Sequence, residues 1–210
     1  GFTTGEFVHW RPEQGTRLGV MPRYGHAADI RWFQIDNGYI FHFFNAYQED
    51  GSIIFDGPLM DRVQAGAGAG NGKSGLAAIP HRFEINLESG YVKRERICDT
   101  PTEFSQIDPR RTGRKHHYGY GYGYDVDSPP IFTHFRYGLR FDLWTGQVRR
   151  HDFGVSNTTG ELLYAPNPES ESEEDGWLIS MVYDRDRVCS EFVVLSAGDI
   201  EAPPLARVRM

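Results

Sequence analysis

The alternation of apolar and polar positions predicts β-strands along nearly the whole chain. Short apolar runs are separated by glycine, proline, asparagine and aspartate, and no segment sustains the 3.6-residue apolar period of an amphipathic helix. Residues 17–22 form the first expected strand. Residues 64–78 are dominated by glycine and alanine, and we expect a surface loop there within one unit spanning residues 1–210. The pattern predicts an all-β fold.

The clearest local signal is a hairpin. Residues 31–35 and 39–46 are two expected strands, and Asp36-Asn37-Gly38 between them is a strong turn signal. A further strand at 52–55 is expected to pair back after the turn at Asp50-Gly51.

One histidine stands in the most apolar of these runs. Residues 38–50 read Gly-Tyr-Ile-Phe-His-Phe-Phe-Asn-Ala-Tyr-Gln-Glu-Asp, so that His42 has aromatic neighbours on both sides. Such a run predicts a strand buried on both faces. The two ring nitrogens of His42 must then be hydrogen-bonded or bind a metal, and the strand pattern leaves both roles open.

A strand–turn–strand pattern recurs along the chain. Residues 82–94 resemble residues 140–150, and residues 191–199 together with 206–210 form a looser third copy. Repeats of about 40–50 residues made of strands are typical of β-propeller blades. A sandwich of hairpins also fits this pattern.

Composition narrows the classes of partner and the compartment. The net charge of −7 argues against a nucleic-acid partner, whose binding surface requires basic residues. The two cysteines, Cys98 and Cys189, are far apart, which argues against a disulfide framework or a zinc ribbon and favours the cytoplasm. No apolar run is long enough to span a bilayer.

Three other clusters have both a functional and a structural interpretation. The pair His116-His117 could bind a metal, but adjacent strand residues point to opposite faces, and nearby arginines and lysine favour a solvated basic loop. The tyrosines of residues 118–124 could stack on a flat substrate, although packing on one face of a glycine-containing strand is the simpler interpretation. The acidic residues 169–175 lack calcium-loop spacing and indicate a solvated face.

Several strings in fixed order resemble one family. They are residues 10–23 (WRPEQGTRLGVMPR), the run around His42, residues 103–110 (EFSQIDPR), 161–168 (ELLYAPNP), 173–181 (EEDGWLISM) and 191–195 (EFVVL). Together they resemble the carotenoid cleavage oxygenases, which include retinoid isomerases and lignostilbene dioxygenases. The resemblance covers almost the whole chain and corresponds to the later half of the family, stopping before its C-terminus.

The resemblance implies a fold and a metal site. The family fold is a seven-bladed β-propeller that holds Fe(II) on its axis through four histidines, three of which hydrogen-bond to glutamates. By resemblance His42 matches the third iron histidine, and Glu103 and Glu161 match two of the supporting glutamates. A carboxylate that accepts the imidazole N–H fixes the tautomer and orients the ring toward the metal.

The resemblance also implies an activity. The intact enzyme would be a dioxygenase that uses O₂ to cleave a conjugated C=C bond of an apolar carotenoid, apocarotenoid or stilbene into carbonyl products. Peripheral membrane contact is implied for the intact enzyme, and the oligomeric state is left open. The three other iron histidines match no residue here, so we expect the chain alone to be inactive. The alternative is a non-catalytic propeller module that binds no iron.

Overall fold

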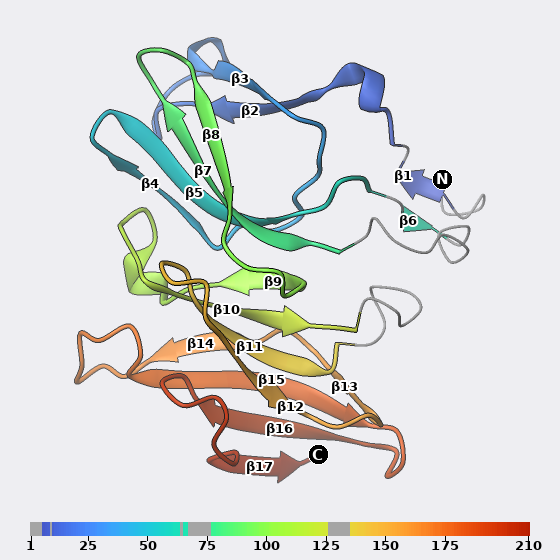
Figure 1. Ribbon diagram of the computed structural model, residues 1–210. Helices are drawn as coiled ribbons and strands as arrows, with labels where there is room; N and C mark the ends of the chain where they lie inside the picture. Colours follow the sequence, from blue (N-terminus) through green and yellow to red (C-terminus); the bar gives the residue numbers. More distant parts are fainter. Residues whose placement is uncertain (1–5, 9, 64, 67–76, 126–134) are drawn as a thin grey trace.

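The computed structural model describes residues 6–8, 10–63, 65–66, 77–125 and 135–210, and these are built almost wholly from antiparallel strands (Figure 1). The helical elements in this part of the chain are the short 3₁₀ turns η1 (Pro12–Gln14), η2 (Ala27–Asp29) and η4 (Pro109–Arg111). No helix of the described residues is long and apolar enough to cross a membrane. The expected all-β fold is confirmed.

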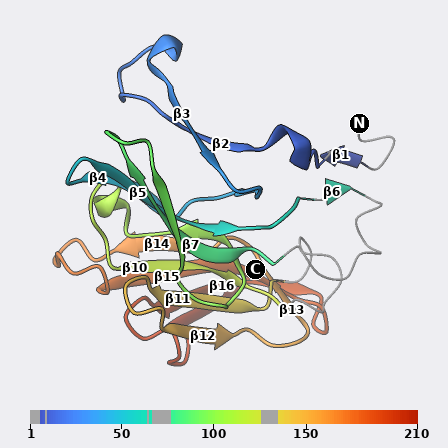
Figure 2. The same ribbon diagram turned by 45° about the horizontal axis from the view of Figure 1, so that its top comes forward.

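Two small pairs of strands begin the chain. β1 (Glu6–Val8) pairs with β6 (Ala65–Gly66), and β2 (Thr16–Val20) pairs with β3 (Arg31–Ile35). β6 lies in the predicted Gly/Ala loop, most of which falls outside the described residues. Figure 2 shows the β2–β3 hairpin beside the sheet that follows it, and Phe33 of β3 packs there against Phe55 and Phe83.

Three larger sheets follow one another along the chain. Their strand orders are β4-β5-β7-β8, β12-β11-β10-β9 and β13-β15-β16-β17, with β14 also paired to β15. The first contains β4 (Asn45–Glu49), β5 (Ser52–Leu59), β7 (Ile79–Asn86) and β8 (Val92–Arg96). The second contains β9 (Thr102–Gln106), β10 (Tyr118–Gly123), β11 (Tyr137–Asp142) and β12 (Val148–Asp152). The third contains β13 (Asn157–Thr159), β14 (Leu163–Pro166), β15 (Gly176–Asp184), β16 (Cys189–Ser196) and β17 (Ala206–Arg209).

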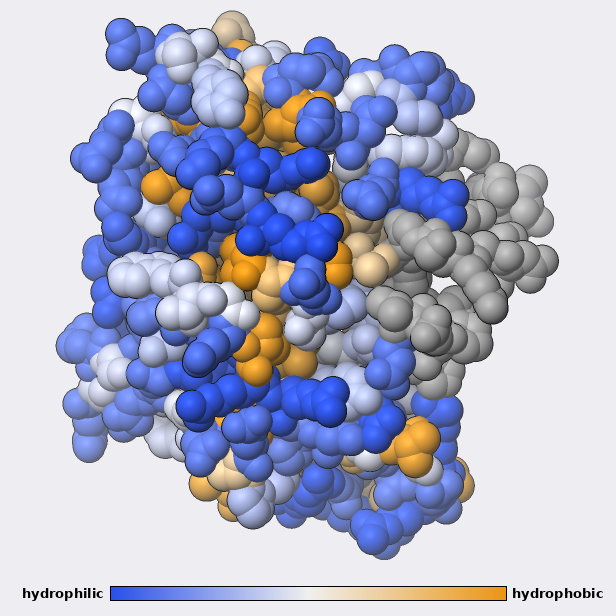
Figure 3. All heavy atoms as spheres, viewed as in Figure 1, coloured by the Kyte–Doolittle hydropathy of each residue, from blue (hydrophilic) through white to orange (hydrophobic). Residues whose placement is uncertain are grey.

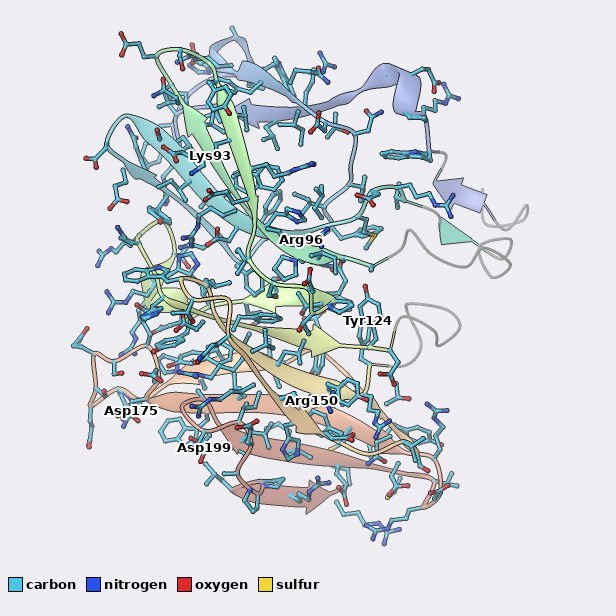
Figure 4. The ribbon with its side chains drawn as sticks, viewed as in Figure 1. Lys93, Arg96, Tyr124, Arg150, Asp175 and Asp199 are labelled. Carbon is cyan, nitrogen blue, oxygen red and sulfur yellow. The ribbon has the colours of Figure 1, made fainter. Side chains whose placement is uncertain are left out.

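The sequence repeats correspond to one part of each large sheet. The three similar segments form the hairpins β7–β8, β11–β12 and β16–β17, which are the last two strands of their sheets. Lys93 and Arg96 on β8 and Arg150 on β12 are labelled on these strands in Figure 4. Charged side chains on an outer strand discourage pairing with other chains.

The predicted hairpin between residues 31–35 and 39–46 is wrong, because β3 pairs with β2 and the strand β4 pairs with β5. The hydroxyl of Thr16 contacts the backbone of Gly38 at both its oxygen (2.9 Å) and its nitrogen (3.2 Å), which ties this segment to β2. Asp36-Asn37-Gly38 therefore links two sheets. The predicted turn at Asp50-Gly51 is confirmed, and both residues have the positive φ of a two-residue hairpin turn (47° and 77°).

The large sheets pack face to face around aromatic side chains. Between the first two, Phe44 meets Phe141 edge to face at 5.4 Å. Between the second and third, the fully buried Tyr120 and Tyr122 of β10 pack with Leu178 of β15. This confirms the structural interpretation of the tyrosine run. From outside, the face in Figure 3 is largely hydrophilic, with hydrophobic side chains showing as smaller patches.

Candidate metal centre

His42 lies in an irregular segment that enters β4. Residues 40–44 are outside any strand, and the His42 side chain is 42% exposed, so the prediction of a doubly buried strand is wrong here. Continued in register, Phe43 would stand opposite Pro58, which has no N–H to donate to a strand ladder. β4 therefore begins only at Asn45, and His42 is left on a segment open to one side.

The His42 ring is held by one buried carboxylate. Nδ1 of His42 lies 2.7 Å from Oε2 of Glu103, whose side chain is only 1% exposed. An ionised carboxylate only accepts hydrogen bonds, so we assign the ring proton to Nδ1. Nε2 then carries the lone pair and can bind a metal. The structure thus brings together two of the three residues that the sequence singled out.

Glu103 is desolvated at this position. Burial raises the pKa of Glu103, and the hydrogen bond from His42 opposes that rise. Burial raises the pKa of Tyr124 to about 12, and the nearby charge of Glu103 adds to the effect. Tyr124 lies just beyond the end of β10 (Figure 4) and its hydroxyl accepts a hydrogen bond from the Ala78 backbone. One side-chain oxygen of Glu103, Oε1, has no hydrogen-bond partner among the described residues.

A β-bulge aims Glu103 toward His42. In the ladder between β9 and β10, Tyr120 stands opposite Gln106 and Tyr122 opposite Glu103, so β9 contains one more residue than its partner. Phe104 within the bulge has a φ of 53°. The strand pattern could not predict this bulge, because no glycine or asparagine marks the position.

Glu161 is not part of this pair. It lies exposed in the link between β13 and β14, and the structure gives it no hydrogen bond within the described residues. Burial raises the pKa of Tyr122, and the charge of Glu161 contributes to that rise, which places Glu161 near the phenol of Tyr122. A supporting role for Glu161 therefore stays a prediction.

The described residues do not by themselves complete a metal site. They contain no group of three or more histidine, cysteine, aspartate or glutamate side chains that could hold an ion. His42 fits the role of a single ligand, because one nitrogen is fixed by a carboxylate and the other is available.

The interpretation of His116 and His117 as a solvated pair is wrong for His116. Its side chain is fully buried, with Nδ1 at 3.2 Å from the Asn45 amide and Nε2 at 3.5 Å from Asp56. His117 instead contacts Asp142 at 3.0 Å and stacks between Tyr118 and Trp144. The two histidines thus have separate surroundings, as expected of adjacent residues, and do not form a metal pair.

Comparison with known proteins decides the family. The model for the family described as retinal pigment epithelial membrane protein matches residues 2–210. The chain belongs to this family. It is 27% identical to an apocarotenoid-15,15'-oxygenase of Synechocystis, over 98% of this chain and 42% of that protein. It is 30% identical to a carotenoid cleavage oxygenase of Mycobacterium tuberculosis, over 92% of this chain and 40% of that protein.

A solved structure of the family confirms the fold. The chain resembles cobalt-substituted Synechocystis ACO with a TM-score of 0.84 and 26% identity, over 95% of this chain and 42% of that one. The expected all-β propeller segment is therefore confirmed. The chain spans about two fifths of the length of the relatives and solved structures that it matches.

Proposed function

We propose that this chain supplies the later blades of a non-haem Fe(II) dioxygenase that cleaves a conjugated C=C bond with O₂ to give two carbonyl products. The observation that carries the proposal is the contact of 2.7 Å between His42 Nδ1 and the buried Glu103 carboxylate, which leaves Nε2 available for a metal. The proposal is supported by relatives whose names specify carotenoid or apocarotenoid oxygenation.

Each residue has a defined role in this proposal. His42 holds iron through Nε2, and Glu103 fixes the tautomer and increases the basicity of the ring. Glu161 supports a second iron histidine, and the three remaining histidines lie outside these 210 residues. When bound, Fe(II) supplies the activation of O₂ that the side chains lack.

The proposed substrate is a flat, conjugated and largely apolar molecule of the carotenoid, apocarotenoid or stilbene class. The ring of Phe104 lies 4.7 Å from that of His42, and Tyr39, in the segment that leads to His42, is 37% exposed. Aromatic side chains provide flat apolar surfaces of this kind. Isoeugenol monooxygenase of Pseudomonas putida, whose name specifies a small aromatic alkene, is 29% identical over 96% of this chain and 45% of its own length.

The remaining features of the proposal concern setting and partners. The proposed compartment is the cytoplasm, supported by Cys98 and Cys189, which are both free thiols. Nucleic acid is not a proposed partner, since the chain carries a net charge of −7. Peripheral contact of the complete enzyme with a membrane is proposed from the apolar nature of the substrate.

Product analysis tests the activity. The complete protein, meaning this chain together with the remaining part of the proposed propeller, is loaded with Fe(II) and incubated with an apocarotenal or a hydroxystilbene. We expect two carbonyl products from one of these substrates under O₂ and none under argon. His42→Ala is expected to reduce product formation at least ~100-fold, in line with the loss of a metal ligand. The matched control His26→Ala removes an exposed histidine and should retain activity. An iron-loaded, folded protein that cleaves neither substrate class contradicts the proposal.

A further inference from the structure

Phe104 has an unusual backbone conformation for its place in the chain. Among the described residues, those other than glycine with positive φ are Asp50, Phe104 and Val188. Asp50 and Val188 lie in hairpin turns, whereas Phe104 lies inside the strand β9. A bulky side chain disfavours this left-handed conformation, which persists only where surrounding contacts hold it and is common at functional sites.

The left-handed backbone at Phe104 supports the contact between Glu103 and His42. The Phe104 N–H donates to Oε2 of Glu103 at 3.2 Å, and the same oxygen lies 2.7 Å from His42 Nδ1. The carboxylate is thus held both by the backbone of its neighbour and by the imidazole.

The ring of Phe104 constrains His42 in a second direction. Its centroid lies 4.7 Å from that of His42, with 33° between the ring planes, and Phe135 contacts it edge to face at 5.4 Å. A single hydrogen bond at Nδ1 fixes one atom of the imidazole, but coupled changes in χ1 and χ2 can still tilt the plane of the ring. A flat ring packed on the imidazole face restricts that tilt.

We propose that Phe104 is a positioning residue that sets the plane of the His42 imidazole, and so the direction in which Nε2 is presented to a metal. Glu103 determines the tautomer, and Phe104 determines the ring orientation. The identity of the metal rests on the proposed function, but the restraint on the ring does not.

Three substitutions separate the ring from the backbone. Phe104→Ala removes the ring and keeps the backbone strain, Phe104→Gly removes both, and Phe104→Tyr keeps the ring. Because glycine adopts positive φ freely, Phe104→Gly is expected to fold at least as stably as Phe104→Ala. Phe43→Ala is the matched control, since Phe43 adjoins His42 in sequence but its ring contacts Phe55 at 5.5 Å.

The first measurement is the binding of Co(II) to the complete protein, monitored through the visible absorption spectrum of the bound metal. We expect Phe104→Gly and Phe104→Ala to weaken Co(II) binding by about tenfold or more, as for other residues that orient metal ligands, and to alter the spectrum. Phe104→Tyr and Phe43→Ala should bind within about twofold of the wild-type protein. Unchanged affinity and spectrum in Phe104→Gly would overturn the proposal.

The second measurement is the NMR relaxation of the His42 ring carbons in the metal-free protein. We expect the order parameter to fall from about 0.85 to below about 0.6 in Phe104→Gly and to be retained in Phe104→Tyr. An equally rigid ring in Phe104→Gly refutes the positioning role. This measurement needs no metal, so it decides about Phe104 even if the wild-type protein binds no Co(II), a result that would contradict the proposed function alone.

Discussion

His42 and His116 show how the surroundings of a histidine determine its role. His42 is partly exposed and faces one buried carboxylate, so one nitrogen stays available. His116 is fully buried, and burial lowers its pKa although the charge of Asp56 acts in the opposite direction. The first environment suits a ligand, and the second keeps a neutral imidazole inside the core.

His116 should make the stability of the protein sensitive to acid. The unfolded chain binds a proton at a pH near 6.5, whereas folded His116, with its lowered pKa, does not. The unfolded state therefore binds more protons below this pH, and the free energy of unfolding falls by up to about 1.4 kcal/mol per pH unit for this group. Urea unfolding of the complete protein from pH 7.5 to 5 should show a smaller decline for His116→Asn than for the wild type.

Several charged groups around His116 also affect its pKa. Burial has the largest effect and lowers the pKa of His116, Asp56 and Glu173 raise it, and Arg82 lowers it further. His81 and His151 also have pKa values lowered by burial and remain in the variant, so only the difference between the two proteins reports on His116. Parallel pH curves for wild type and variant would contradict the assignment.

The sequence singled out His42 and Glu103 through their resemblance to one family, and the structure brings these two side chains into contact. Sequence reasoning missed Phe104 and the buried network around His116. The backbone conformation of Phe104 depends on a bulge that no turn residue announces. The burial of His116 depends on Asn45 and Asp56, which lie about sixty or more residues earlier in the chain and meet it only in the folded sheets.

At the level of elements, β10 alternates tyrosine with glycine because its two faces meet different neighbours. Tyr120 and Tyr122 fill the core toward the third sheet. On the opposite face, a Cβ atom at Gly119 would lie 2.6 Å from the ring of Phe44, and one at Gly121 would lie 2.5 Å from the Thr102 hydroxyl. Gly119 thus allows the first and second sheets to approach closely, and Gly121 makes room for Thr102 of the neighbouring strand β9.

Gly119→Ala should therefore destabilise the protein by about 1–3 kcal/mol through overpacking against Phe44. Gly160→Ala is the control, since the nearest atom to its Cβ would lie at 3.4 Å, an ordinary contact, and we expect a change of about 0.5 kcal/mol or less. Urea unfolding curves measure both changes. Equal stability of the two variants would show that the close approach at Gly119 is not limiting.

Element boundaries were only partly predictable. The repeats identified the hairpins β7–β8, β11–β12 and β16–β17, since apolar alternation and glycine turns are local signals. The pairing of residues 31–35 was not predictable from its turn, because the competing strand β2 and the Thr16 hydroxyl take the place of the expected partner. The start of β4 was not predictable from its own residues, because it depends on Pro58 of the neighbouring strand β5.

On the scale of the whole molecule, three stacked sheets follow two small strand pairs, and His42 meets Glu103 where the first large sheet adjoins the second. The chain spans about two fifths of its relatives, and it contributes one proposed iron ligand together with the carboxylate that orients it. The central claim is that this pair forms part of an iron centre, rather than a satisfied histidine in a propeller that binds no metal.

Iron stoichiometry tests this claim most directly. The complete wild-type protein, its His42→Ala variant and the His26→Ala control are purified, loaded anaerobically with Fe(II), desalted and analysed for iron. We predict about one iron per protein for the wild type and the control, and less than about a tenth of that for His42→Ala. A folded wild-type protein without iron, or a His42→Ala variant that retains all of it, would contradict the account.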